Sequence, residues 1–84
     1  MNQVFVVAFN PYQDRARAGG FNYYFSREQA DLNFNLQCYN NSTHLVKMLE
    51  CQTNYQDRAL IASDIDRRLD DGENFPVIKE YCPI

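Results

Sequence analysis

The sequence has little of what catalytic and metal-binding sites are built from. Its 84 residues contain one His, three Cys and no Trp. Catalysis by a thiolate needs a Cys, a His and an orienting group, and a zinc site needs three or four converging ligands. His44 lies six residues after Cys38 and seven before Cys51, so the fold would have to assemble either arrangement. A Cys/His-dependent enzyme is therefore the least favoured function, and we expect no metal and no cofactor.

The chain also has no long hydrophobic run and no disulfide pattern. The apolar run from Val4 to Phe9 is about six residues long, which is too short for a signal peptide or a membrane span. An odd number of cysteines with no Cys-x-x-Cys pair argues against a disulfide framework. The expected compartment is a reducing cytoplasm, with no membrane partner.

Positive charge is scarce. The net charge is −3, and Lys47 and Lys79 are the two lysines of the chain. Binding to nucleic-acid phosphates requires a clustered positive surface, so direct nucleic-acid binding is not expected. The acids near the C-terminus are interleaved with arginines, in the series Asp64, Asp66, Arg67, Arg68, Asp70 and Asp71. This pattern predicts a solvated face of mixed charge and not a mimic of DNA.

Aromatic residues are plentiful, with six Tyr and six Phe, so residues 1–84 can build the core of one small domain. The β-branched run from Val4 to Phe9 predicts a central strand that is buried on both faces. After the Gly19-Gly20 loop signal, Phe21, Tyr23 and Phe25 alternate and predict a second strand, paired with the first as a hairpin.

A helix is predicted next, from about Arg27 to Tyr39. Ser26 to Gln29 match a capping box, and Leu32 and Leu36 precede Tyr39 at helical spacing. Residues 32–38 also alternate as a strand would, and the cap decides for the helix.

A third strand is predicted over His44–Cys51. Apolar residues at helical spacing from Leu60 to Leu69, followed by Gly72, then predict a second helix. The alternative for this segment is a hairpin in which Ala59–Ile65 forms a strand.

The last strand is predicted over Phe75–Cys82, and Pro76 places it at a sheet edge. The predicted order is β-β-α-β-α-β. The expected fold is α+β, with a four-stranded, mostly antiparallel sheet and two helices packed on one of its faces.

One pentapeptide, Tyr-Gln-Asp-Arg-Ala, occurs at 12–16 and again at 55–59. If the two copies are adjacent in space, they present two tyrosines and two arginines, which are residue types typical of binding hot spots. Alternatively, each copy caps the segment after a strand, since Asp suits the first turn of a helix. The candidate partner-binding residues of the two copies are Tyr12, Asp14, Arg15, Tyr55, Asp57 and Arg58.

Asp70 and Asp71 are two further candidates for partner binding. They lie near the expected end of the second helix, where acids oppose the helix dipole. Such a placement favours the binding of a positive group.

In composition the chain resembles small bacteriophage or prophage accessory proteins, through runs such as Phe21-Asn22-Tyr23-Tyr24 and Asn33-Phe34-Asn35. This resemblance implies a non-enzymatic inhibitor, of the anti-defence or anti-CRISPR kind, that docks on a host protein. The alternative is a homodimeric structural or regulatory module, in which the second copy covers sheet that two helices leave open.

Overall fold

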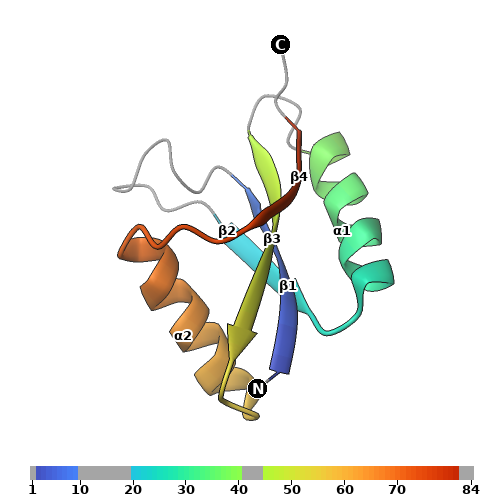
Figure 1. Cartoon of the computed structure of the whole chain (residues 1–84). Coiled ribbons are helices and arrows are strands. Elements are labelled where there is room, and N and C mark those ends of the chain that lie inside the picture. Colours follow the sequence, from blue (N-terminus) through green and yellow to red (C-terminus); the bar gives the residue numbers. More distant parts are fainter. Residues whose placement is uncertain (1, 10–19, 41–44, 82–84) are drawn as a thin grey trace.

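The computed structural model of this chain describes residues 2–9, 20–40 and 45–81. Its elements are β1 (Asn2–Phe9), β2 (Gly20–Tyr24), α1 (Arg27–Asn40), β3 (Val46–Thr53), α2 (Arg58–Asp70) and β4 (Val77–Tyr81). Figure 1 shows the four strands as one sheet with a helix to either side. The predicted α+β class and the order β-β-α-β-α-β are therefore confirmed.

The sheet has the order β2-β1-β3-β4, and each neighbouring pair is antiparallel. β1 is central, as its doubly apolar sequence predicts, and it forms the expected hairpin with β2. Val6 lies opposite Tyr23 on one side and opposite Leu49 on the other. β3 begins two residues later than the predicted strand, and β4 lies at the edge, directly after Pro76.

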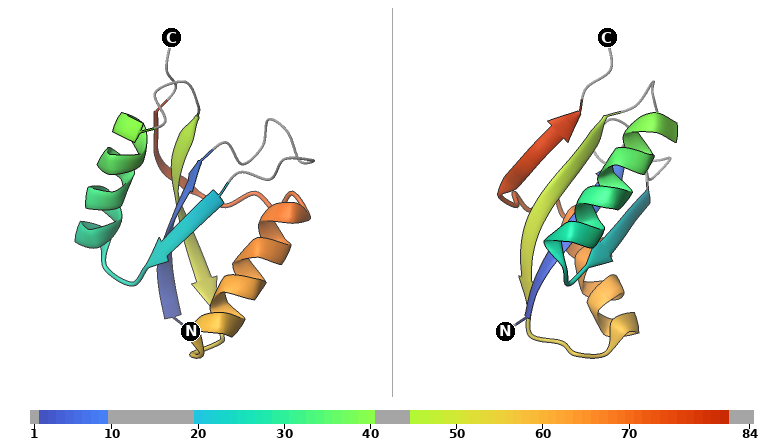
Figure 2. Two further views of the ribbon diagram at one scale, coloured as in Figure 1. Left: turned by 180° about the vertical axis from the view of Figure 1, so that it is seen from behind. Right: turned by 90° about the vertical axis from the view of Figure 1, so that its right-hand side faces the viewer.

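The prediction that both helices pack on one face of the sheet is wrong. One cluster joins the sheet to α2 and consists of Val4, Val6, Ala8, Leu49, Cys51, Ile61, Ile65 and Phe75. A second cluster joins the sheet to α1 and consists of Val7, Ala30, Phe34, Val46 and Met48. Successive residues of a strand point to opposite faces, so α1 and α2 cover opposite faces of β1 and β3. Both panels of Figure 2 show this arrangement.

Two covered faces explain why β1 is apolar on both sides. Val4 and Val6 are buried under α2, and Val7 is buried under α1. A second copy of the chain is therefore not needed to cover this strand, and the reason given for a homodimer no longer holds.

α1 is helical through residues 32–38, so the cap signal was the correct guide. The Ser26 hydroxyl accepts a hydrogen bond from the Gln29 backbone N–H at 3.4 Å, and the Ser26 carbonyl accepts one from Ala30 at 3.1 Å. Ala30 and Phe34 form the buried side of the helix. The apolar residues at positions 32, 36 and 39 lie on its exposed side.

α2 is a helix, which excludes the alternative hairpin. Ile61 and Ile65 are buried one turn apart and fix its inner face to the sheet. The chain leaves the helix through Asp71 and then Gly72, whose φ of 80° lies in the left-handed region that glycine adopts easily. The predicted stop at Gly72 is confirmed.

Candidate functional site

The second copy of the pentapeptide begins α2, and its aspartate is the helix cap. The carboxylate of Asp57 accepts hydrogen bonds from the backbone N–H groups of Ala59 (2.9 Å) and Leu60 (3.2 Å). Each bond satisfies a donor that the first turn of a helix leaves without a partner. The capping interpretation is therefore confirmed for this copy.

Arg58 connects the start of α2 to the segment that follows β2. Its guanidinium carbon lies 5.8 Å from the centroid of the Phe25 ring, and its carbonyl accepts a 3.0 Å hydrogen bond from the Tyr23 hydroxyl. The rings of Tyr23 and Phe25 meet edge to face at 6.0 Å. The Arg58 side chain is exposed, so it can both pack within the fold and reach a partner.

Tyr55 is held through its backbone and leaves its ring half exposed. Its N–H donates to the Thr53 hydroxyl at 3.3 Å, and its carbonyl accepts from the Asn2 side chain at 3.0 Å. The first copy, with Tyr12, Asp14 and Arg15, lies outside the described residues. Adjacency of the two copies therefore stays a prediction, as does the partner-binding role of Tyr55, Asp57 and Arg58.

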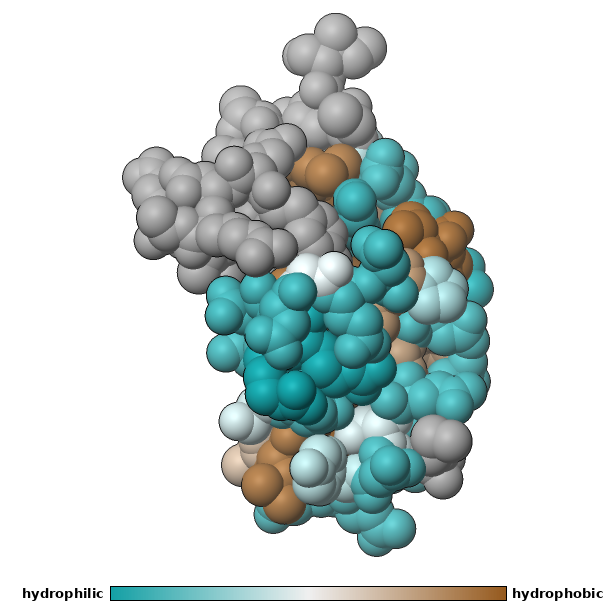
Figure 3. All heavy atoms as spheres, turned by 60° about the vertical axis from the view of Figure 1, so that its left-hand side comes forward, coloured by the Kyte–Doolittle hydropathy of each residue, from teal (hydrophilic) through white to brown (hydrophobic). Residues whose placement is uncertain are grey.

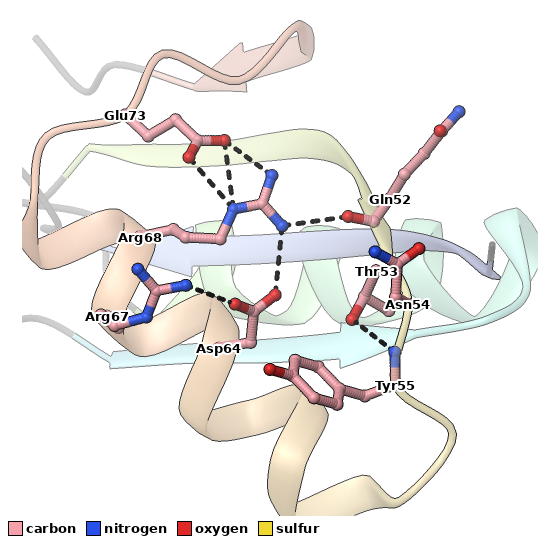
Figure 4. A pocket seen from close by; sticks show the side chains of 8 residues that line it. All are labelled: Gln52, Thr53, Asn54, Tyr55, Asp64, Arg67, Arg68 and Glu73. Atoms are coloured by element: carbon pink, nitrogen blue, oxygen red, sulfur yellow. Dashed lines mark hydrogen bonds and ion pairs between the residues drawn. The ribbon is translucent and has the colours of Figure 1, made fainter.

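Arg68 is the centre of a charged cluster between α2, β3 and the segment before β4. Its guanidinium binds Glu73 at 2.6 Å and Asp64 at 3.2 Å, and it donates to the carbonyl of Gln52 at 3.0 Å. The same group lies over the Phe75 ring, 4.9 Å from its centroid. These contacts tie the end of α2 to the core, and Figure 4 shows the guanidinium between the two carboxylates.

The ion pair between Arg68 and Glu73 shifts the pKa of both groups. The Arg68 hydrogen bond holds the pKa of the Glu73 carboxyl below its ordinary value, and the same bond raises the pKa of Arg68. Both groups are therefore charged at neutral pH.

Arg67 supplies positive charge on the outer side of the same helix. It forms ion pairs with Asp64 at 2.8 Å and with Asp71 at 3.7 Å. Asp71, one of the predicted binders of a positive group, thus has a positive neighbour in the last turn of α2, the helix that it caps. Asp70 is exposed at the last residue of α2, and its role in partner binding stays a prediction.

A hollow of about 490 Å³ opens beside this cluster. It is lined by Gln52, Thr53, Asn54, Tyr55, Asp64, Arg67, Arg68 and Glu73, all drawn in Figure 4. Because its arginines and acids already bind one another, a ligand would have to break these ion pairs in order to use their charge. We interpret the cluster as a structural tie and not as the functional site.

The described thiols are not activated. Burial raises the pKa of Cys51, against the lowering effect of Arg68, and burial likewise raises the pKa of Cys38. The two cysteines are free and pack on opposite faces of the sheet. His44 and Cys82 lie outside the described residues.

Neither a cluster of metal ligands nor a membrane-spanning helix is present in the described part of the chain. Within residues 2–9, 20–40 and 45–81, no three or more His, Cys, Asp or Glu side chains gather as a metal site would require. Neither α1 nor α2 is long and apolar enough to cross a bilayer.

The outer face of α1 is the most distinctive surface among the described residues. Leu32, Leu36 and Tyr39 are 72%, 53% and 85% exposed, and their spacing of four and three residues places them side by side along the helix. We call these three residues the apolar stripe. The buried side of α1 carries a second apolar set, Ala30 and Phe34. A helix that is apolar on two opposite sides has two surfaces to cover, and the sheet covers one of them.

Sequence reasoning overlooked this surface, although its signal was present. The alternation of apolar residues over 32–38, once the segment is known to be helical, places Phe34 opposite Leu32 and Leu36. The pattern that resembled a strand was that of a helix with two apolar sides.

Comparison of the chain with protein-family models, with curated proteins and with solved structures gave no match. The function must therefore be inferred from the surfaces of the molecule itself.

Proposed function

We propose that this protein is a non-enzymatic binding module that docks on another protein through the apolar stripe of α1. The observation that carries this proposal is the exposure of Leu32, Leu36 and Tyr39 on one helix face. Single exposed apolar residues are ordinary on a protein surface, whereas three that adjoin on one helix face form a candidate interaction site. Tyrosine is in addition one of the residue types that dominate binding hot spots.

The charged face of α2 is a poorer candidate. Its arginines and acids are joined in ion pairs, and breaking these pairs would oppose any gain from new contacts. Figure 3, which brings the α2 side of the molecule forward, shows a mainly hydrophilic surface with hydrophobic residues in separate small areas. The contrast supports α1 as the docking surface.

The kind of partner that we propose is based on the amino-acid composition of the chain. The resemblance to small phage accessory proteins leads us to propose a host protein, such as a component of a defence system, that docking would obstruct. The free thiols of Cys38 and Cys51 support a reducing compartment such as the cytoplasm.

The test is affinity capture from the native host cell with matched variants. We expect Leu32→Gln with Leu36→Gln to reduce recovery of the bound protein at least tenfold, because the loss of two apolar contacts of about 1 kcal/mol each weakens binding to that extent. The control is Leu60→Gln, since Leu60 on α2 is 52% exposed and Leu36 is 53% exposed.

Gln is a good helix former, so both variants are expected to keep the wild-type circular dichroism spectrum and urea midpoint. Equal recovery with the double variant and the control would rule out the apolar stripe as the docking surface. Recovery of no protein by the wild type would rule out the binding module.

A further inference from the structure

Resting on the proposed function, we infer that the partner holds α1 in an apolar groove with basic side chains along its rim, and that this partner is a different protein and not a second copy of this chain. Anchors spaced by four and three residues on one helix face are the pattern by which helix-in-groove complexes are recognised. The apolar stripe has this pattern in Leu32, Leu36 and Tyr39.

The buried side of α1 is packed against the sheet, so the helix is already formed before a partner binds. Phe34 and Ala30 are buried against the sheet. Lys79 of β4 binds the Asp31 carboxylate at 2.7 Å and lies over the Phe34 ring, 4.8 Å from its centroid. A helix that is already ordered loses little conformational entropy on binding, which favours its use as the inserted element.

The charge beside the apolar stripe is negative. At 100° per residue, the positions that flank the stripe are occupied by Glu28, Gln29, Asn35 and Asn40. The base at the start of α1, Arg27, pairs with Asp31 at 3.3 Å, and the last turn contains no basic residue. The negative end of the helix dipole is therefore not offset by a basic side chain of that turn. The Glu28 carboxylate and the negative end of the α1 dipole are therefore complementary to basic side chains on the rim of the partner's groove.

Pairing with a second copy would not supply that charge. In a parallel pair of α1 helices Glu28 meets Glu28, and in an antiparallel pair it meets the negative end of the other helix. Contact area gives a second argument. A helix face of 14 residues is roughly 21 Å by 10 Å, or about 200 Å², whereas a stable interface needs about 800 Å² from each partner. The walls of a groove also cover the flanking residues, and a second convex helix does not.

The experiment uses a photoreactive phenylalanine analogue placed at one of two tyrosines of the full-length chain. Tyr39 is 85% exposed on the apolar stripe, and Tyr55 is 45% exposed beside the Arg68 cluster. After irradiation in the native cell, the cross-linked peptides of the partner are sequenced. The inference expects cross-links from position 39, within an apolar groove bordered by Lys or Arg on a different protein.

The cross-linked protein is then purified and titrated with charge variants. We expect Glu28→Lys to weaken binding at least fivefold at low salt and Glu28→Gln to weaken it less. The control is Asp66→Lys, which makes the same charge change at an exposed position of α2 and should stay within twofold of the wild type. The effect of Glu28→Lys should shrink as salt is raised.

The outcomes separate this inference from the proposed function. Cross-links from position 39 to α1 of another copy, or unchanged binding by Glu28→Lys, would overturn the basic groove on a different protein. Cross-links from position 55 alone would overturn it as well, while leaving a binding function located at the second pentapeptide. Absence of cross-links from both positions would overturn the proposed function itself.

Discussion

The two helices of this protein cover opposite faces of one sheet, yet they present opposite kinds of surface to the outside. α2 buries Ile61 and Ile65, and its exposed side carries ion pairs around Arg67 and Arg68, with Leu60 as its one large exposed apolar residue. α1 buries Ala30 and Phe34, and its exposed side carries the apolar stripe. The inner face of each helix is explained by folding, and the outer face of α2 is explained by its own ion pairs. The outer face of α1 remains unexplained by the monomer, which is why we assign the function to it.

The largest difference in stability is expected between substitutions on the buried and the exposed side of α1. Phe34→Ala should lower the free energy of unfolding by about 3 kcal/mol, because it empties a core position that is 7% exposed. Leu36→Ala, two residues away, should change it by less than about 0.5 kcal/mol, since Leu36 faces outward. Urea denaturation of both variants measures the difference. A large, concentration-dependent loss in Leu36→Ala would instead show that the stripe is covered by another copy.

A smaller difference in stability is expected between substitutions of the two arginines of α2, Arg67 and Arg68. Arg68→Gln should cost about 2 kcal/mol, because it removes charged hydrogen bonds to Glu73 and Asp64 from a side chain that is 20% exposed. Arg67→Gln should cost less than about 0.5 kcal/mol, since Arg67 is 65% exposed. Thermal unfolding at low and high salt tests both variants, and equal effects would contradict the structural role given to Arg68.

The sequence predicted what depends on local pattern. Alternation, capping residues and glycine act over a few residues. They predict the element order, the central position of β1, the cap of α1 at Ser26 and the stop of α2 at Gly72. The assignment of helices to faces was beyond local pattern. The sequence indicated that the run from Val4 to Phe9 is buried on both faces. It did not indicate that a different helix covers each face, which the two core clusters show.

The candidate site was less predictable for a related reason. The pentapeptide is conspicuous in the sequence because it is repeated, but in its second copy Asp57 serves the fold as a helix cap. The apolar stripe was not recognised because Leu32 and Leu36 resemble core residues. Only the structure shows that Phe34 fills the core between α1 and the sheet and leaves its neighbours outside.

The smallest difference in stability is expected between substitutions of the residues that cap the two helices. Asp57→Ala should destabilise the fold by about 1 kcal/mol, because its carboxylate accepts two backbone hydrogen bonds, at 2.9 and 3.2 Å, and its charge favours the positive end of the α2 dipole. Ser26→Ala should cost about half as much, since its neutral hydroxyl accepts one bond of 3.4 Å at the start of α1. Chemical denaturation of both variants provides the comparison.

A conservative change decides whether Asp57 acts as a cap or as a contact for the partner. Asn is as good a cap as Asp, so Asp57→Asn should restore most of the stability lost in Asp57→Ala. If binding to the captured protein is also unchanged in Asp57→Asn, the second pentapeptide serves α2 alone and the apolar stripe of α1 is the surface that meets the partner. If stability is restored but binding is lost, the charge of Asp57 takes part in recognition, and the start of α2 joins α1 in the interface.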